Sequence, residues 1–338
     1  MRKLTAPLVI LALLLCGCTA GEKNWQRFSR TYYDAFDTVI TLTCLAESEA
    51  VFTEAVDEFE AGLLRLDAVF DAYEPHEGVS GLWALNHASG EWVSVEPELL
   101  SLLEQFWEWR ALGETRVNIA MGNVLQIWHD YREAGVALPP EEALRDAAAL
   151  ADMDAIELDA ANGRVRLGDP ALILDLGAVA KGWSVERLAG SLQKRCPEYL
   201  INAGGNVRAG GRTHDSIHTW RVGITNPMQP ETYLRVLDLT DMSAVTSGGY
   251  QRYYEVDGVR YHHLIDPDTL MPANFVAQVT VLTKDSGLAD YLSTTAFLLP
   301  YEESRALIER LEDTEAIWVL NDGTIQTTDG ARALIERE

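Results

Sequence analysis

The hydrophobic pattern changes about halfway along the chain. Residues 47–73 carry apolar side chains at helical spacing, and residues 96–112 repeat that spacing, so both segments are predicted to be amphipathic helices. Residues 32–45 (YYDAFDTVITLTCL) alternate and are rich in aromatic and β-branched residues, which predicts a first strand. From Ala155 onward, short alternating runs are separated by turn residues. The pattern predicts an α+β fold of mixed, mostly antiparallel sheets with flanking helices.

Two dipeptides in the strand-rich part are typical of hairpin turns. They are Asn162-Gly163 and Asp257-Gly258, each lying between alternating segments. Residues 171–177 (ALILDLG) form an apolar run that predicts a buried strand leading into a helix. We find no repeat, low-complexity segment or Pro/Gly/Ser-rich linker in this part, so we expect one compact domain.

The N-terminus has the pattern of a bacterial lipoprotein signal. Two cations precede an apolar run that is too short to span a membrane but suits a signal-peptide core. Small or apolar residues lead into Cys18, which we expect to carry the lipid; ordinary secretion or an uncleaved N-terminal anchor is the alternative. The predicted organisation is a signal peptide over 1–17, a short tether over 18–29 and a domain over 30–338. We therefore expect an extracytoplasmic protein, lipid-anchored to the cell (inner) membrane.

The negative net charge of the chain limits the classes of molecule that it can bind. Loss of the two cations in the signal segment takes the formal net charge from −25 to −27. Such an acidic surface repels nucleic acid and anionic lipid, so we expect no nucleic-acid partner. A phosphate-bearing ligand must be held by a local cation, a metal ion or backbone N–H groups.

Two cysteines remain besides the lipid-bearing one. Cys44 and Cys196 are too few for a disulfide framework, and neither lies in a recognisable nucleophile context. They either pair with each other in an oxidising compartment or remain buried free thiols, and the sequence leaves both alternatives open.

Three segments combine Gly residues or an apolar face with polar side chains. ILDLGAVAKGWSVE places Asp175 and Lys181 at a predicted strand-to-helix junction, where helix N–H groups favour anions; a packed turn without a ligand is the alternative. NAGGN, at 202–206, indicates either a nearby ligand or a tight bulge. In LADYLSTTAFLL, Asp290 and Thr294 are four residues apart and share one helix face. Their oxygen atoms suit Mg²⁺, whereas ordinary capping and hydroxyl-to-backbone bonding are the alternative.

The segment TSGGYQRYYEVDGVRYHHLIDP, residues 246–267, offers His262, His263 and Asp266 as possible metal ligands. Adjacent residues of a strand point to opposite faces, so the two histidines cannot both bind one ion without distortion. At most one of the two histidines can then take part in a given site, the other is a packing or solvated neighbour, and Asp266 is expected to fix the turn before Pro267.

Taken together, DLGAVAKG, NAGGN, TSGGYQRYYEVDGVRYHHLIDP and ADYLSTTAF resemble, in this order and spacing, the ApbE family of extracytoplasmic flavin transferases. The resemblance spans essentially the whole chain after the signal segment and implies a single compact ApbE-like (T-fold-like) domain. It implies Mg²⁺-dependent transfer of FMN from FAD to a Thr or Ser hydroxyl of a target protein, with release of AMP. The implied partners are FAD and an acceptor protein, which is part of a membrane redox complex or a flavin-bearing reductase.

The resemblance also implies roles for individual residues. Asp290 and Thr294 match side-chain metal ligands, the carbonyl of Ala178 matches a third ligand, and Ser293 is a minor candidate. His263 matches the general base or positioning group for the incoming hydroxyl, and its unperturbed pKa suits that work near neutral pH. The implied flavin-nucleotide contacts are Phe36, Tyr73, Arg116, Val117, Asn118, Asp175, Lys181 and Ile265.

The chain departs from the family pattern at three places along the expected flavin cleft. Phe36-Asp37 replaces Met-Gly, Asn118-Ile119-Ala120 replaces Asp-x-Thr, and Leu270 replaces the Gly of DPxTGxP. Two other functions are therefore open: a metal-dependent FAD pyrophosphatase with water as acceptor, and a flavin-binding lipoprotein without turnover.

Overall fold

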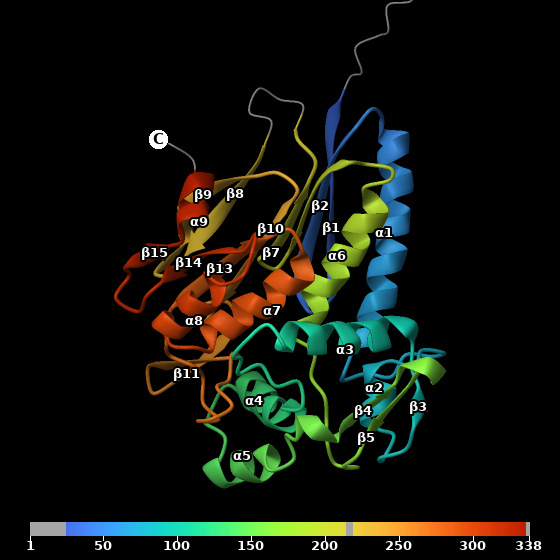
Figure 1. The fold of residues 1–338 in the computed structure, drawn as a ribbon, viewed down its shortest axis with the longest axis vertical. Helices are drawn as coiled ribbons and strands as arrows, with labels where there is room; N and C mark the ends of the chain where they lie inside the picture. Colours follow the sequence, from blue (N-terminus) through green and yellow to red (C-terminus); the bar gives the residue numbers. More distant parts are fainter. Residues whose placement is uncertain (1–24, 214–218, 336–338) are drawn as a thin grey trace, which may run out of the picture.

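The computed structural model describes residues 25–213 and 219–335, shown as the coloured ribbon of Figure 1. The strands are β1 (Gln26–Ala35), β2 (Thr38–Ala46), β3 (Val93–Ser94), β4 (Ile156–Asp159), β5 (Arg164–Leu167), β6 (Glu198–Ala203), β7 (Asn206–Gly210), β8 (Trp220–Asn226), β9 (Gln229–Leu239), β10 (Met242–Gly248), β11 (Tyr253–Val256), β12 (Val259–His262), β13 (Gln278–Thr283), β14 (Glu315–Val319) and β15 (Ile325–Thr327). The α-helices are α1 (Glu49–Phe70), α2 (Leu82–Asn86), α3 (Pro97–Arg110), α4 (Gly122–Ala134), α5 (Glu141–Ala148), α6 (Ala180–Leu192), α7 (Ser286–Phe297), α8 (Tyr301–Ile308) and α9 (Asp329–Leu334).

One large sheet forms the centre of the described residues. Its eight strands follow the order β1-β2-β6-β7-β10-β13-β14-β15, and every neighbouring pair is antiparallel. Smaller sheets pair β8 with β9, β11 with β12, and β5 with both β3 and β4. The predicted fold class, mixed with mostly antiparallel sheets and flanking helices, is confirmed.

The large sheet is covered on both faces. Helices α1, α6 and α7 pack along one face, with α3 crossing below them in the view of Figure 1. The β8–β9 hairpin and α9 cover part of the other face. Side chains alternate accordingly along β2, where Leu42 and Cys44 belong to the core under the helices and Leu45 to the smaller core under the hairpin.

The expected first strand is in fact a hairpin. β1 and β2 are joined at Phe36 and Asp37, whose φ angles are 54° and 47°. Two consecutive left-handed residues match the right-handed twist of paired strands, so this turn closes the hairpin tightly. The prediction of a single strand was wrong because the turn contains neither Gly nor Asn, the residues that normally reveal such a turn.

The expected buried strand over 171–177 is irregular rather than part of a sheet. Its Leu side chains are buried as predicted, but side-chain amides take part of its backbone bonds. Asn86 accepts from the N–H of Leu174 at 2.9 Å and donates to its carbonyl at 2.9 Å, and Asn123 accepts from the N–H of Ile173 at 3.1 Å. Backbone bonds to residues 119–122 complete the pairing: the Gly122 N–H donates to the Ile173 carbonyl at 3.0 Å, and the Asp175 N–H donates to the Ile119 carbonyl at 2.9 Å.

The predicted signal peptide (1–17), Cys18 and most of the tether lie outside the described residues. β1 begins at Gln26, so the last four residues assigned to the tether belong to the first strand of the domain. Within residues 25–213 and 219–335, no helix combines the length and the apolar character needed to cross a membrane.

Candidate functional site

The polar side chains of α7 lie on a buried helix. Asp290 and Thr294 are 5% and 8% exposed, and they stand one turn apart as the sequence predicted. Asp285 caps the helix by accepting the N–H of Leu288 at 2.8 Å. Ser293, the minor ligand candidate, shares a hydrogen bond of 2.8 Å with Ser247 and donates to the Asp290 carbonyl at 3.0 Å, so its hydroxyl is already engaged.

The first turn of α6 faces Asp290. The Gly182 N–H donates to Asp290 Oδ2 at 2.7 Å, and the Lys181 ammonium lies 3.2 Å from Oδ1. A side chain at position 182 would not fit, because a Cβ there would come within 2.4 Å of both the Asp290 Cβ and the Ser286 carbonyl oxygen. The glycine of DLGAVAKG therefore permits the two helices to approach until a buried carboxylate receives a backbone N–H.

These residues fit a hard divalent cation such as Mg²⁺. The candidate donors are all oxygen atoms: the Asp290 carboxylate, the Thr294 hydroxyl and the Ala178 carbonyl. The Gly182 N–H belongs to the first turn of α6, where N–H groups have no partner within the helix, and it donates to Asp290. No group of three or more His, Cys, Asp or Glu suited to a metal gathers within the described ranges. A site with one carboxylate suits Mg²⁺, which keeps waters and binds substrate phosphate.

A cavity of about 250 Å³ opens beside the irregular segment that precedes α6. Its lining includes Tyr73, Asn86, Gln126 and Asp175. Tyr73 is half exposed and packs on His129 with 5.3 Å between ring centroids and an interplanar angle of 34°. It also forms a hydrogen bond with Asp175, so two of the predicted flavin contacts meet here.

The carboxyl group of Asp175 is the acidic group in the lining of this cavity. Burial raises the pKa of its carboxyl, while the Gly177 N–H, which donates to Oδ1 at 2.8 Å, lowers it. Its own backbone N–H donates to the carbonyl of Ile119 at 2.9 Å. The carboxylate is thus a fixed acceptor at the wall of the cavity, suited to a hydroxyl or amino group of a ligand.

The two adjacent histidines contact different neighbours, as the strand geometry predicted. His262 Nε2 donates to the Ala273 carbonyl at 2.9 Å, its Nδ1 accepts the Leu264 N–H at 3.2 Å, and its ring packs edge-on against Phe297. His262 is therefore a packing residue with both ring nitrogens engaged.

His263 lies in a different environment. Its backbone N–H and its Nδ1 both bond the Arg252 carbonyl, at 3.2 and 3.3 Å. Burial, followed by the positive charges of Arg252 and Arg132, lowers the pKa of His263 to about 3. The assumption of an unperturbed pKa was wrong, because it ignored burial beside two cations; in this state the ring is neutral at physiological pH.

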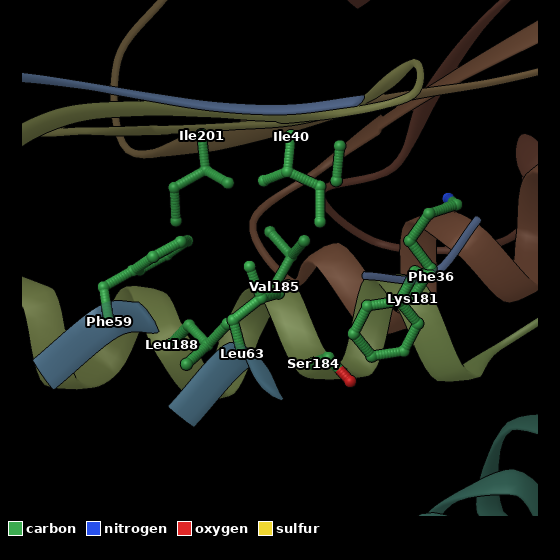
Figure 2. A pocket seen from close by; sticks show the side chains of 10 residues that line it. Phe36, Ile40, Phe59, Leu63, Lys181, Ser184, Val185, Leu188 and Ile201 are labelled. Atoms are coloured by element: carbon green, nitrogen blue, oxygen red, sulfur yellow. The ribbon is translucent and has the colours of Figure 1, made fainter. Parts of the chain in front are cut away.

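Arg252 joins the histidine segment to the first hairpin. Its guanidinium donates to the Asp37 carbonyl oxygen and lies 3.3 Å from the Asp37 carboxylate. Figure 2 shows the neighbouring Phe36 ring beside Lys181 at one end of an apolar contact region between α1, α6 and the sheet. That region leaves no space for a water molecule, so the predicted flavin contact at Phe36 packs against the Lys181 side chain in this state.

Residues 115–122 connect the separate parts of the site. Thr115 contacts Thr295 of α7 at 3.1 Å through their hydroxyls, and Arg116 pairs with Asp266 at 3.2 Å. The Asn118 side chain fixes the neighbouring backbone, since it donates to the Ala151 carbonyl and accepts from the Ala120 N–H. Val117 is buried at 4% exposure. Three predicted flavin contacts, Arg116 to Asn118, thus lie on one segment between α7 and Asp175.

The turn after His263 is fixed by Asp266, as expected. Its carboxylate accepts from the Asp268 N–H at 3.2 Å and from the Thr269 hydroxyl at 3.1 Å. Ile265 is 5% exposed and packs in the small core that contains Trp128, so it supports the turn from inside.

Sequence reasoning missed Arg252, His129 and Asn86 as parts of the site. Arg252 and His129 act through long-range contacts that no local spacing reveals. Asn86 had one available signal, a polar residue in an otherwise apolar stretch, and it is 8% exposed. It holds the segment that carries Asp175 in place.

The comparisons with known proteins cover nearly the whole chain. A profile described as "ApbE family" matches residues 36–318. A Treponema pallidum protein named FAD:protein FMN transferase is 32% identical over 95% of this chain and 92% of its own length. A Vibrio cholerae protein of the same name is 30% identical over 89% of this chain and 90% of its own length. The crystal structure of the ApbE protein from Thermotoga maritima superposes with a TM-score of 0.83 at 25% identity, covering 93% of this chain and 100% of that one. The chain belongs to the ApbE family.

Proposed function

We propose that this protein transfers FMN from FAD to a Thr or Ser hydroxyl of an acceptor protein, with Mg²⁺ bound at Asp290, Thr294 and the Ala178 carbonyl. The relatives named FAD:protein FMN transferase support the reaction class. The observation that carries the proposal is the buried Asp290 carboxylate, which receives the Gly182 N–H at 2.7 Å beside Lys181. A carboxylate held in this way can bind a cation, and a bound cation beside Lys181 would supply the local positive charge that a phosphate needs in a chain whose net charge is strongly negative.

Bound Mg²⁺ would neutralise charge on the pyrophosphate and help to orient it. Lys181 then contributes a second cation at the first turn of α6, where free helix N–H groups also favour phosphate oxygens. The cavity of about 250 Å³ is smaller than the usual 300–1,000 Å³ of a whole small-ligand site. We infer that it takes only one ring system of FAD, with Asp175 accepting a hydrogen bond from it.

The geometry of His263 suits removal of the hydroxyl proton. A carbonyl oxygen can only accept, so the bond to the Arg252 carbonyl places the ring proton on Nδ1 and leaves the lone pair of Nε2 free. The negative charge of bound FAD would raise the lowered pKa of His263; as the acceptor oxygen then bonds to the FMN-side phosphorus, its proton passes to Nε2. The bond from that phosphorus to the bridging oxygen breaks, and AMP leaves with the electron pair.

The test combines the protein with FAD, Mg²⁺ and a candidate acceptor domain from a flavin-bearing membrane redox complex or reductase. We expect flavin fluorescence on the denatured acceptor and an equal amount of AMP. An acceptor whose target hydroxyl is replaced (Thr→Ala) is the matched control and should release no AMP. AMP without labelled acceptor would establish the FAD pyrophosphatase instead, and FAD binding without either product would establish the non-catalytic alternative.

We also propose that a lipid on Cys18 anchors the domain at the outer face of the inner membrane. The lipoprotein pattern around Cys18 supports this location. Replacement of Cys18 by Ala should move the protein from the membrane fraction to the soluble extracytoplasmic fraction. Equal membrane association of both forms would contradict the anchor.

A further inference from the structure

Two buried cysteines meet where α6 ends against the large sheet. Cys44 lies on β2 and is fully buried, and Cys196 follows α6 and is 1% exposed. Cys196 closes the end of the helix by donating its N–H to the Leu192 carbonyl at 2.8 Å, and Pro197 prevents the helix from continuing. Both side chains belong to the core between the helices and the sheet.

The two thiols are direct neighbours. Both are free thiols whose side chains interact: Cys44 lies on β2, and Cys196 lies just before β6, the strand that pairs with β2. Cys44 is opposite Tyr199 in this pairing, three residues after Cys196. Nothing in the proposed transfer reaction uses either sulfur, and both lie away from the Asp290 end of α6.

We propose that Cys44 and Cys196 form a disulfide in the mature protein. Two observations carry the proposal: the free thiols interact with each other, and both are enclosed by the core. It rests on the proposed extracytoplasmic location, which is an oxidising compartment. Because neither sulfur is accessible in the folded state, the bond must form before this part of the core closes.

The oxidant is a disulfide of the exchange type, carried by a protein or by a small thiol compound. One cysteine thiolate attacks this disulfide, giving a mixed disulfide and releasing one thiol of the oxidant. The second cysteine thiolate then attacks the protein sulfur of the mixed disulfide and releases the other thiol. The two cysteine protons end on the two thiols of the reduced oxidant, so the protein loses two electrons and two protons.

The bond would fasten the C-terminal end of α6 to β2. The N-terminal end of α6 carries Lys181 and Gly182, which contact Asp290, and β2 follows the Phe36–Asp37 turn. The bond would join two residues about 150 positions apart in sequence, which strongly restricts the conformations of the unfolded chain. We therefore expect a rise in the melting temperature on the order of 5 °C.

The deciding experiment traps the thiols in cells that make the full chain with its N-terminal segment. Cells are quenched in acid, and the protein is denatured with N-ethylmaleimide and digested with trypsin without reductant. We expect the peptides 31–65 and 196–208 to be joined, unlabelled and lighter by two hydrogens than their sum. Dithiothreitol in denaturant should separate them, whereas the native protein should resist it. N-ethylmaleimide on both cysteines, or linkage of either one to another partner, would overturn the proposal.

Thermal unfolding provides a readout that does not depend on trapping. The oxidised protein should melt on the order of 5 °C above the fully reduced and refolded protein. The variants Cys44→Ala and Cys196→Ala each remove one sulfur and should show no reductant-dependent shift. If these variants fail to fold, the peptide measurement on the unaltered protein still decides the proposal. A reductant-dependent shift of equal size in a single-cysteine variant would also overturn it.

Discussion

Trp128 donates its indole N–H to the carbonyl oxygen of Leu270 over 2.9 Å, which ties α4 to the turn that follows His263. Trp128 is 2% exposed and stacks on Tyr261 of β12 with 6.3 Å between ring centroids. The same turn is held at its other end by Asp266 and Arg116. Leu270 itself has a φ of 58°, so these contacts hold a leucine in a conformation that favours glycine.

Replacement of Trp128 by Phe should destabilise the protein by about 2 kcal/mol, because a buried ring becomes smaller and the partly buried Leu270 carbonyl loses its donor. Trp318→Phe is the matched control: Trp318 is fully buried, and its indole N–H has no partner among the described residues. Both changes shrink a buried ring, but only the first breaks a hydrogen bond. Urea unfolding followed by circular dichroism measures the difference, and equal losses in the two variants would show that the bond contributes nothing.

Leu270→Gly should be more stable than Leu270→Ala by about 1 kcal/mol. Both variants lose the same packing against the small core around Trp128, but only glycine adopts a φ of 58° without strain. The comparison therefore isolates the backbone conformation at the position where the family pattern has glycine. Urea midpoints at one pH provide the measurement; an alanine variant as stable as the glycine variant would contradict the strain.

Asp290→Asn should reduce Mg²⁺-dependent AMP release by at least about 100-fold. The amide keeps the size of the side chain and can still accept the Gly182 N–H, so the fold should persist while the charge is lost. Asp313→Asn is the control, since Asp313 pairs with Lys284 on an exposed surface and should retain full activity. Undiminished metal-dependent turnover in Asp290→Asn would remove this carboxylate from the metal site.

His263 should make the protein less stable in mild acid. The fold, mainly through burial, lowers its pKa from 6.5 to about 3, so between these pH values His263 is protonated in the unfolded chain but neutral in the folded protein. The contribution of neutral His263 to the free energy of unfolding is fully present above about pH 6.5. It is lost as the pH falls toward about 3, by up to about 1.4 kcal/mol per pH unit. In His263→Gln this contribution is absent, so urea midpoints at several pH values should show a shallower decline. Parallel pH profiles for the two proteins would refute the lowered pKa.

The fold was predictable where local chemistry agrees with the tertiary structure. The Asn162-Gly163 and Asp257-Gly258 turns and the helices near 47–73 and 96–112 are confirmed within a few residues. The turn at Phe36 was missed because Phe36 is not a turn-type residue and Asp37 has no Gly or Asn beside it. The helices α4 and α5 were also missed, because their apolar stripes are short and contact a small separate core.

The site was predictable mainly through its helix and its glycines. Spacing alone places Asp290 and Thr294 on one face, and the need for a glycine at 182 follows from the close approach of two helices. The pKa of His263 could not be predicted, since it depends on Arg252 and Arg132, which only the tertiary fold brings near. The spacing of residues within one motif does not reveal charged groups that the fold brings near from elsewhere in the chain.

The segment of residues 115–122, which connects the separate parts of the site, limits where this protein can be engineered. Its first residue touches α7, its second the Asp266 turn, and its fifth the backbone of Asp175. A substitution there alters one contact, whereas an inserted or deleted residue displaces three parts of the site at once. The length of this segment is therefore more constrained than its composition, and tags or inserted domains belong elsewhere, such as the exposed tip of the β8–β9 hairpin near Met228.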